Sequence, residues 1–252
     1  MHDRILILIW TEDSQIFRAE IPNGSLLDDK VLSNAVGERI PENHLFPPWR
    51  DTLTEAQQPL SPDVYVKKHY AALRGYDGTP SVTELVMAEV GVLEIISKKA
   101  HPNVNKYLGC IRNGDAIGGI CLQKHDWTLS DLVEGKIPAD RTPPFQPDVI
   151  ISGIRAALDH IHSFGLVHDD VNPRNIMVDN AGNPIIIDFD SCVPVGAPSR
   201  GGTPGWTKSP KFAAFENDTY SFELVRKFVQ GEYDGMDFDF DFDENLDAIS
   251  PK

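Results

Sequence analysis

The pattern of hydrophobic and polar positions divides the chain into a strand-rich first half and a helix-rich second half. Strands are expected where apolar side chains alternate or form short runs, because neighbouring side chains of a strand point to opposite faces. The expected strands are Ile5–Trp10, Gln15–Ile21, Val64–Tyr70, Leu166–Val167, Ile185–Ile187 and a hairpin, Tyr107–Leu122, that turns at Asn113-Gly114. Helices are expected where apolar positions recur every three or four residues. The expected helices are Ser25–Ile40, Ser81–Lys99, Leu129–Glu134, Asp148–Phe164 and Tyr220–Val229, and the proline-rich segment Pro41–Pro62 reads as a surface connection.

Length and composition indicate a soluble globular protein. The 252 residues can form one large domain or two small lobes, and 41% hydrophobic with 24% charged residues is an ordinary balance. The longest aliphatic run, Ile5–Trp10, is too short for a membrane span or a signal-peptide core, so no membrane partner is expected. Cys110, Cys121 and Cys192 show no paired metal-ligand spacing. Free thiols suit a reducing compartment, which predicts an intracellular, cytoplasmic protein.

The charge is acidic and unevenly distributed. A net charge of -15 argues against a nucleic-acid partner, whose phosphates would be repelled. From Gly231 onward acidic residues far outnumber the one lysine, and Asp237–Asp243 alternates Asp with Phe. Such a segment offers little varied apolar surface for a core, so residues 231–252 are expected to form an acidic, disordered tail.

The polar loop at 167–178 and the strand end at 185–190 carry the most specific signal. The first reads Val-His-Asp-Asp-Val-Asn-Pro-Arg-Asn-Ile-Met-Val, and the second reads Ile-Ile-Ile-Asp-Phe-Asp. Here the chain resembles the eukaryotic protein kinase family, whose catalytic loop has His-Arg-Asp, an Asn five residues later and then Asp-Phe-Gly. The resemblance places Asp170 at the catalytic Asp, Asn175 at the loop Asn and Asp188 at the metal-binding Asp.

These residue types suit phosphoryl transfer. The reaction needs the phosphates neutralised and the acceptor hydroxyl aimed in line with the bond that breaks. Mg²⁺, or Mn²⁺ in its place, takes hard oxygen ligands such as those of Asp188 and the Asn175 amide. Asp170 would orient the acceptor hydroxyl and receive its proton. Turn residues between two strands would explain any one of the three, but poorly explain all three at the family's spacing.

Other stretches resemble the family in the same order. Val64–Lys67 is similar to its Val-Ala-Ile-Lys strand, which implies that Lys67 holds the α- and β-phosphates of ATP, although Lys68 on the opposite strand face is one residue away. Glu89 falls where the family pairs a helix glutamate with that lysine, and a solvated helix face is the alternative. Leu122 would be the gatekeeper, and the backbone from Gln123 to His125 would bind adenine.

The resemblance runs from about Val64 to Val229 and implies a bilobal, α+β protein-kinase-like fold with a strand-rich N-lobe and a truncated helical C-lobe. Gly202–Trp206 is similar to the end of an activation segment. Asn217–Ser221 is similar to the start of helix F, where Asp218 would bond to the catalytic-loop backbone. The combination of motifs looks most like a divergent fungal kinase-like group. The implied division is an N-terminal extension or part of the N-lobe at 1–62, an N-lobe at 63–125, a C-lobe at 126–230 and the tail at 231–252.

Several positions depart from the family pattern. No glycine-rich phosphate loop precedes Lys67, which leaves nucleotide positioning to other residues. Asp169 stands where the family has Arg, so a phosphorylated activation segment would meet no cation there. Asn172 replaces the lysine that neutralises the γ-phosphate; Arg174 would substitute for it or make a surface contact. Little sequence follows Val229 to form late helices that dock protein substrates.

Three functions therefore compete. The first is an ATP- and Mg²⁺-dependent kinase that phosphorylates a hydroxyl group on a protein or a small molecule. The second is a pseudokinase that keeps the fold and acts through binding. The third is a small-molecule kinase of the aminoglycoside or choline type, which shares the core motif. Gly202–Trp206 and the helix F pattern favour the first.

Overall fold

The computed structural model describes residues 5–13, 15–22, 36–208 and 210–233. The chain divides into two compact units, Met1–His125 and Asp126–Lys252. Within the described part of the chain, no helix combines the length and the apolar character needed to span a membrane. The acidic Asp/Phe segment lies outside the described residues.

The described residues of the first unit form two separate antiparallel sheets. One has the order β1-β2-β3, and the other has the order β4-β6-β5. The first sheet consists of β1 (Ile5–Glu12), β2 (Gln15–Pro22) and β3 (Glu38–Arg39). The second consists of β4 (Val64–Lys67), β5 (Tyr107–Asn113) and β6 (Ala116–Gln123). The β1–β2 hairpin therefore does not extend the sheet that carries Lys67.

The β1–β2 hairpin is held by an aromatic pair and by an arginine. The rings of Trp10 and Phe17 stack with 5.6 Å between their centroids. Arg18 donates from Nε to the carbonyl of Leu73, at 3.0 Å. The helix predicted for Ser25–Ile40 is wrong at its C-terminal end, because residues 36–40 are not helical and include β3. The rest of that predicted helix, up to residue 35, lies outside the described residues.

The β5–β6 hairpin turns at the expected place. Gly114 has a φ of 60°, a conformation that glycine adopts without steric cost. The predicted strand Val64–Tyr70 is shorter than expected: β4 ends at Lys67, and a 3₁₀ helix, η1 (His69–Gly75), follows.

Residues 41–62 are more than a surface connection. They include the short helix α2 (Glu42–Leu45), and Leu45 and Ala56 are buried. The segment then runs along the β5–β6 hairpin, where the Ala56 N–H donates to the Cys110 carbonyl at 2.9 Å. Gly109 permits this approach, since a Cβ there would lie 2.7 Å from the carbonyl oxygen of Thr54.

Helix α3 (Ser81–Ile96) packs its apolar face into the core of the first unit, as its periodicity predicts. The buried apolar residues of this face are Val82, Val86, Val90, Val92, Leu93 and Ile96. Glu89 lies among them and has no exposed surface. The helix thus carries one carboxylate into an otherwise apolar interior.

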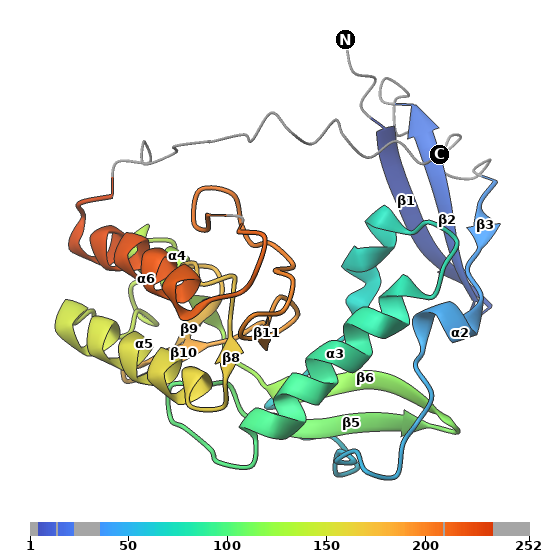
Figure 1. Cartoon of the computed structure of the whole chain (residues 1–252), viewed down its shortest axis with the longest axis horizontal. Helices are drawn as coiled ribbons and strands as arrows, with labels where there is room; N and C mark the ends of the chain where they lie inside the picture. The colour runs from blue at the N-terminus through green and yellow to red at the C-terminus, as the bar shows by residue number, and fades with distance from the viewer. Residues whose placement is uncertain (1–4, 14, 23–35, 209, 234–252) are drawn as a thin grey trace. The chain divides into compact units, whose positions relative to one another are not determined.

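The second unit is mainly helical. Its helices are α4 (Leu129–Val133), α5 (Pro147–His162) and α6 (Phe215–Gln230), and α5 and α6 pack side by side (Figure 1). Its short strands are β7 (Trp127–Thr128), β8 (Leu166–Val167), β9 (Ile176–Val178), β10 (Pro184–Ile186) and β11 (Val193–Pro194). The loop between β8 and β9 carries Asp170, and the residues after β10 carry Asp188.

Helix α6 is longer than its sequence pattern predicts. It begins at Phe215 and ends at Gln230, and the C-cap residue Gly231 has a φ of 72°, which suits a left-handed C-cap. Tyr233, placed by sequence in the tail, stacks on Trp206 with 4.6 Å between centroids. The folded part of the chain therefore includes the first residues of the predicted tail.

Candidate functional site

Lys67 and Glu89 form an ion pair within the first unit. Lys67 Nζ lies 2.8 Å from Glu89 Oε1, and His69 Nε2 lies 2.6 Å from Glu89 Oε2. Burial raises the pKa of Glu89, but the hydrogen bond from His69 and the nearby charge of Lys67 outweigh burial, so the pKa lies below its ordinary value. The solvated helix face that was the alternative for Glu89 is wrong. His69 was missed by sequence reasoning, because the predicted strand continued past it.

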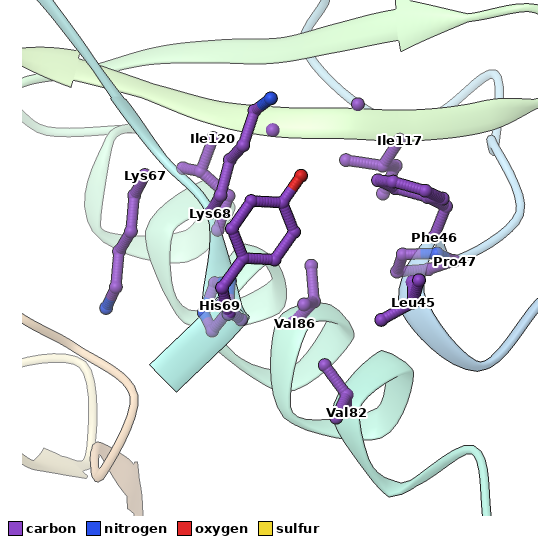
Figure 2. A pocket seen from close by; sticks show the side chains of 13 residues that line it. Leu45, Phe46, Pro47, Lys67, Lys68, His69, Val82, Val86, Ile117 and Ile120 are labelled. Atoms are coloured by element: carbon purple, nitrogen blue, oxygen red, sulfur yellow. The ribbon is translucent and has the colours of Figure 1, made fainter. Parts of the chain in front are cut away.

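Lys67 and Lys68 leave the chain in different directions (Figure 2). Lys68 Nζ lies over the ring of Tyr70, 5.7 Å from its centroid. The pocket in Figure 2 lies between α3, β6 and residues 45–47. Its walls are largely apolar, with the residues Leu45, Phe46, Pro47, Val82, Val86, Ile117 and Ile120. Lys67 is thus the lysine that pairs with Glu89, whereas Lys68 contacts Tyr70.

The residues predicted to bind adenine stand at the end of β6. Leu122 is buried and lies opposite Tyr65 of β4 in the sheet register. The N–H of Gln123 donates to the carbonyl of Lys106 at 2.9 Å. His125 Nε2 lies 3.3 Å from the side-chain oxygen of Asn105. These contacts fix the strand end within its own unit.

In the second unit, N–H donors hold the carboxylate of Asp170 from both sides. Oδ2 accepts from Asn175 Nδ2 at 2.8 Å. Oδ1 accepts from the backbone N–H of Thr203 at 2.7 Å and from Asn172 Nδ2 at 3.1 Å. The carboxylate therefore has a fixed orientation. Asn172 also donates to the hydroxyl of Thr203 at 3.1 Å, so it links the loop to residues 196–207 and supplies no charge.

Asn175 is oriented by the same contact. Its amide nitrogen donates to both the carboxylate and the backbone carbonyl of Asp170, at 2.8 and 3.0 Å. Because the nitrogen is used there, the amide oxygen is turned away from Asp170 as a potential ligand. Asp188 follows β10 with a φ of 66°, a strained value of the kind found at functional sites. Arg174 is exposed.

Within the described residues, no group of three or more His, Cys, Asp or Glu side chains is arranged to hold a metal ion. The two metal ligands predicted from the sequence, Asp188 and the Asn175 amide, are both hard oxygen donors of the second unit. Two such ligands fit Mg²⁺, which is usually held by one or two protein groups together with phosphate oxygens and water.

Asp218, a buried acid of α6, anchors the catalytic loop through its backbone N–H groups. It has no exposed surface, and it accepts from the N–H groups of His168 and Asp169, both at 2.8 Å. His162 Nε2 also lies 2.8 Å from this carboxylate. His168 uses both ring nitrogens, toward the carbonyl of Ile187 and the N–H of Asp170. It is therefore a structural part of the loop.

Asp169 makes contacts that the sequence did not reveal. Its Oδ2 accepts from the hydroxyl of Ser199 at 2.5 Å, and its Oδ1 accepts from the amide of Asn217 at 2.9 Å. The only sequence signal was that an acid replaced the expected arginine. The identity of its partners depends on how residues 196–207 fold back onto the loop.

Comparisons with known proteins agree with this geometry. Residues 63–216 match the family described as "Protein kinase domain". The chain is 29% identical over 125 residues to Mitogen-activated protein kinase kinase kinase 3 of Arabidopsis thaliana, covering 45% of this chain and 18% of that protein. It is 30% identical over 135 residues to the Serine/threonine-protein kinase/endoribonuclease IRE2 of Homo sapiens, covering 48% of this chain and 14% of that protein. The chain thus spans less than a fifth of either relative.

The family match covers more than half of the chain and includes Lys67, Glu89 and the loop with Asp170. The mixed strands and helices have the α+β class expected of this fold. With its strand-rich first unit, its helical second unit and this match, the chain belongs to the protein kinase domain family.

Proposed function

We propose that this chain is an ATP- and Mg²⁺-dependent phosphotransferase of the protein-kinase type that acts on a hydroxyl group. The observation that carries the proposal is the carboxylate of Asp170, which is held by the donors of Asn175, Asn172 and Thr203. A base that must orient an acceptor hydroxyl needs such a fixed position. Turn residues with no catalytic role would not need it.

Different residues are suited to different parts of the substrate. Lys67 provides a cation for the α- and β-phosphates, and Glu89 keeps its ammonium group in one place. Asp188 and the oxygen of Asn175 are suited to hold Mg²⁺ (or Mn²⁺), which neutralises charge on the phosphates when bound. Leu122, Gln123 and His125 would contact adenine. Arg174, exposed in the structure, is the proposed cation for the γ-phosphate in place of Asn172.

The acceptor is proposed to be a serine or threonine of a protein, with a small-molecule hydroxyl as the alternative. The ordered segment near Asp170 supports a protein acceptor: Thr203 contacts both Asp170 and Asn172. Both relatives named above are described as protein kinases, although this chain spans only a small part of each.

A pseudokinase is the second candidate, and one observation favours it. The β1–β2 hairpin contains no glycine-rich turn and does not join the sheet of Lys67. The backbone amides that would approach the phosphates are therefore not supplied by a strand next to β4. A binding module would tolerate this loss better than an enzyme would.

The deciding experiment measures ADP release. The purified protein is incubated with ATP, Mg²⁺ and a generic acceptor such as myelin basic protein or a mixed Ser/Thr peptide library. The Asp170→Asn variant serves as the matched control, because it preserves the size of the side chain. Turnover by the chain and its loss in the variant would support the enzyme. Nucleotide binding by both without turnover by either would favour the pseudokinase.

A further inference from the structure

Asp169 is a buried carboxylate whose side-chain hydrogen-bond partners among the described residues are all neutral. It is 2% exposed, and its oxygens accept from the hydroxyl of Ser199 and the amide of Asn217. None of the ion pairs among the described residues includes Asp169. Burying a charge is costly unless hydrogen bonds compensate for the lost water. The hydroxyl of Ser199 and the amide of Asn217 therefore stabilise the buried carboxylate.

The backbone directs this side chain toward Ser199. Asp169 has a φ of 64°, in the left-handed region that Asp and Asn tolerate better than most residues. Its N–H donates to the fully buried Asp218 at 2.8 Å. The backbone of Asp169 is thus held in place, and its carboxylate is positioned to accept a hydrogen bond from Ser199.

Ser199 connects this acceptor to the segment that reaches Asp170. Its hydroxyl donates to Asp169 and accepts from the N–H of Gly201 at 3.0 Å. Gly202 then passes so close that a Cβ would lie 2.5 Å from the Asp169 carbonyl oxygen. The next residue, Thr203, donates its N–H to Asp170 at 2.7 Å. A short chain of contacts therefore runs from Asp169 to the carboxylate of Asp170.

We propose that Asp169 is a positioning residue: through the unmodified hydroxyl of Ser199 it holds residues 199–203 against the catalytic loop, and a negative charge at position 199 releases them. The positioning role rests on the proposed phosphotransferase function, whereas the contact itself does not. A carboxylate or phosphate at position 199 would face the buried carboxylate of Asp169, which takes part in no ion pair among the described residues. A negative charge at position 199 therefore releases residues 199–203 from the catalytic loop.

The test uses two substitutions that differ only in charge. Ser199→Asn keeps an N–H donor for Asp169, whereas Ser199→Asp has nearly the same size and brings a negative charge. Hydrogen–deuterium exchange on the full chain reports the amides of Gly201 and Thr203. We expect Ser199→Asp to speed their exchange by about tenfold or more, and Ser199→Asn to change it by less than about threefold.

A second variant gives the reciprocal result. In Asp169→Asn/Ser199→Asp the repulsion is gone, because an amide at 169 can donate to the new carboxylate. We expect exchange in this double variant to return to within about threefold of the parent chain. Asn, like Asp, tolerates the positive φ of position 169, so added backbone strain does not affect the comparison.

The activity measurement separates the two proposals. If the chain turns over ATP, Ser199→Asp should lower kcat more than it raises KM for nucleotide, and the double variant should restore kcat. If the chain shows no turnover, the proposed function fails, and the exchange data still decide on the contact. Equal exchange in Ser199→Asp and Ser199→Asn would overturn the proposal, and so would a double variant that exchanges as fast as Ser199→Asp.

Discussion

Lys67 and Glu89 are joined by an ion pair of 2.8 Å in which the glutamate is fully buried and its second oxygen is bound by His69. Both residues of the pair belong to the first unit. A buried carboxylate with two partners of this kind is costly to disturb from either side, because the remaining group would be left without its counter-charge. This arrangement has consequences for both stability and its dependence on pH.

Replacing Glu89 by Gln should lower the free energy of unfolding by about 3 kcal/mol at pH 7, because Lys67 would remain without its counter-charge. The pKa of Glu89 lies below its ordinary value of 4.5. A lowered folded-state pKa stabilises the fold above the unfolded value, and this stabilisation is lost as the pH falls through the folded-state pKa. Urea denaturation of the parent chain and of Glu89→Gln should therefore show a difference in the free energy of unfolding at pH 7. This difference should become smaller below about pH 4.

The matched control is Glu84→Gln, which changes an exposed residue of the same helix. It should alter the free energy of unfolding by less than about 0.5 kcal/mol. A loss in the free energy of unfolding of similar size for Glu89→Gln and Glu84→Gln would contradict the assignment of a buried ion pair.

Asp170→Asn and Asp188→Asn should fail in different ways. Asp170 is proposed to face the acceptor, so its variant should lose at least about a hundredfold in turnover while nucleotide affinity changes only a few-fold. Asp188 is proposed to hold the metal, so its variant should weaken binding and turnover together. Calorimetry with ATP and Mg²⁺, together with ADP release, measures both quantities. Full turnover by Asp170→Asn would show that another group receives the proton.

Removing the metal should weaken ATP binding by about tenfold or more, since Asp188 and Asn175 are proposed to hold the nucleotide only through a cation. The measurement is a titration with ATP in Mg²⁺ and in EDTA. Adenosine is the control ligand, because it has no phosphates and its affinity should not respond to EDTA. An ATP affinity that is unchanged in EDTA would favour the pseudokinase.

The unphosphorylated chain should be as active as any form phosphorylated at Thr203 and more active than one phosphorylated at Ser199. The reason is that Asp169 already holds Ser199 without a phosphate. Phosphatase treatment of a form phosphorylated only at Thr203, checked by intact mass, should leave turnover within about twofold, whereas treatment of a form phosphorylated at Ser199 should raise it. Activity that disappears after treatment and returns on phosphorylation of Thr203 would refute this.

Cys110 should react slowly with thiol reagents in the folded chain. Burial raises the pKa of its thiol to about 11, and burial likewise raises the pKa of Cys121. At pH 8 only about one thiol in a thousand would then be ionised at Cys110, and the thiolate is the reactive form. Labelling followed by peptide mass spectrometry should show strong protection that is lost in urea. Fast labelling of the native chain at Cys110 would show that β5 opens readily.

Local patterns were sufficient for most of the secondary structure. Helix α3 and the β5–β6 hairpin were predictable because periodicity and a turn glycine act over neighbouring residues. The helix predicted to end at Ile40 failed where β3 pairs with β2, because pairing with a distant strand outweighs a weak helical pattern. The strand expected to reach Tyr70 stopped at Lys67 for a related reason: His69 turns inward to bind Glu89.

The sequence alone determined the candidate chemistry, because Asp170, Asn175 and Asp188 lie close together in motifs whose spacing is itself the signal. It also marked Asp169 and Asn172 as departures from the family pattern. Only the tertiary structure decided what those departures do. Asp169 meets Ser199 and Asn217, and Asn172 joins Asp170 to Thr203. Contacts between residues this far apart in the chain depend on the path of the intervening backbone, and no local pattern of residues encodes that path.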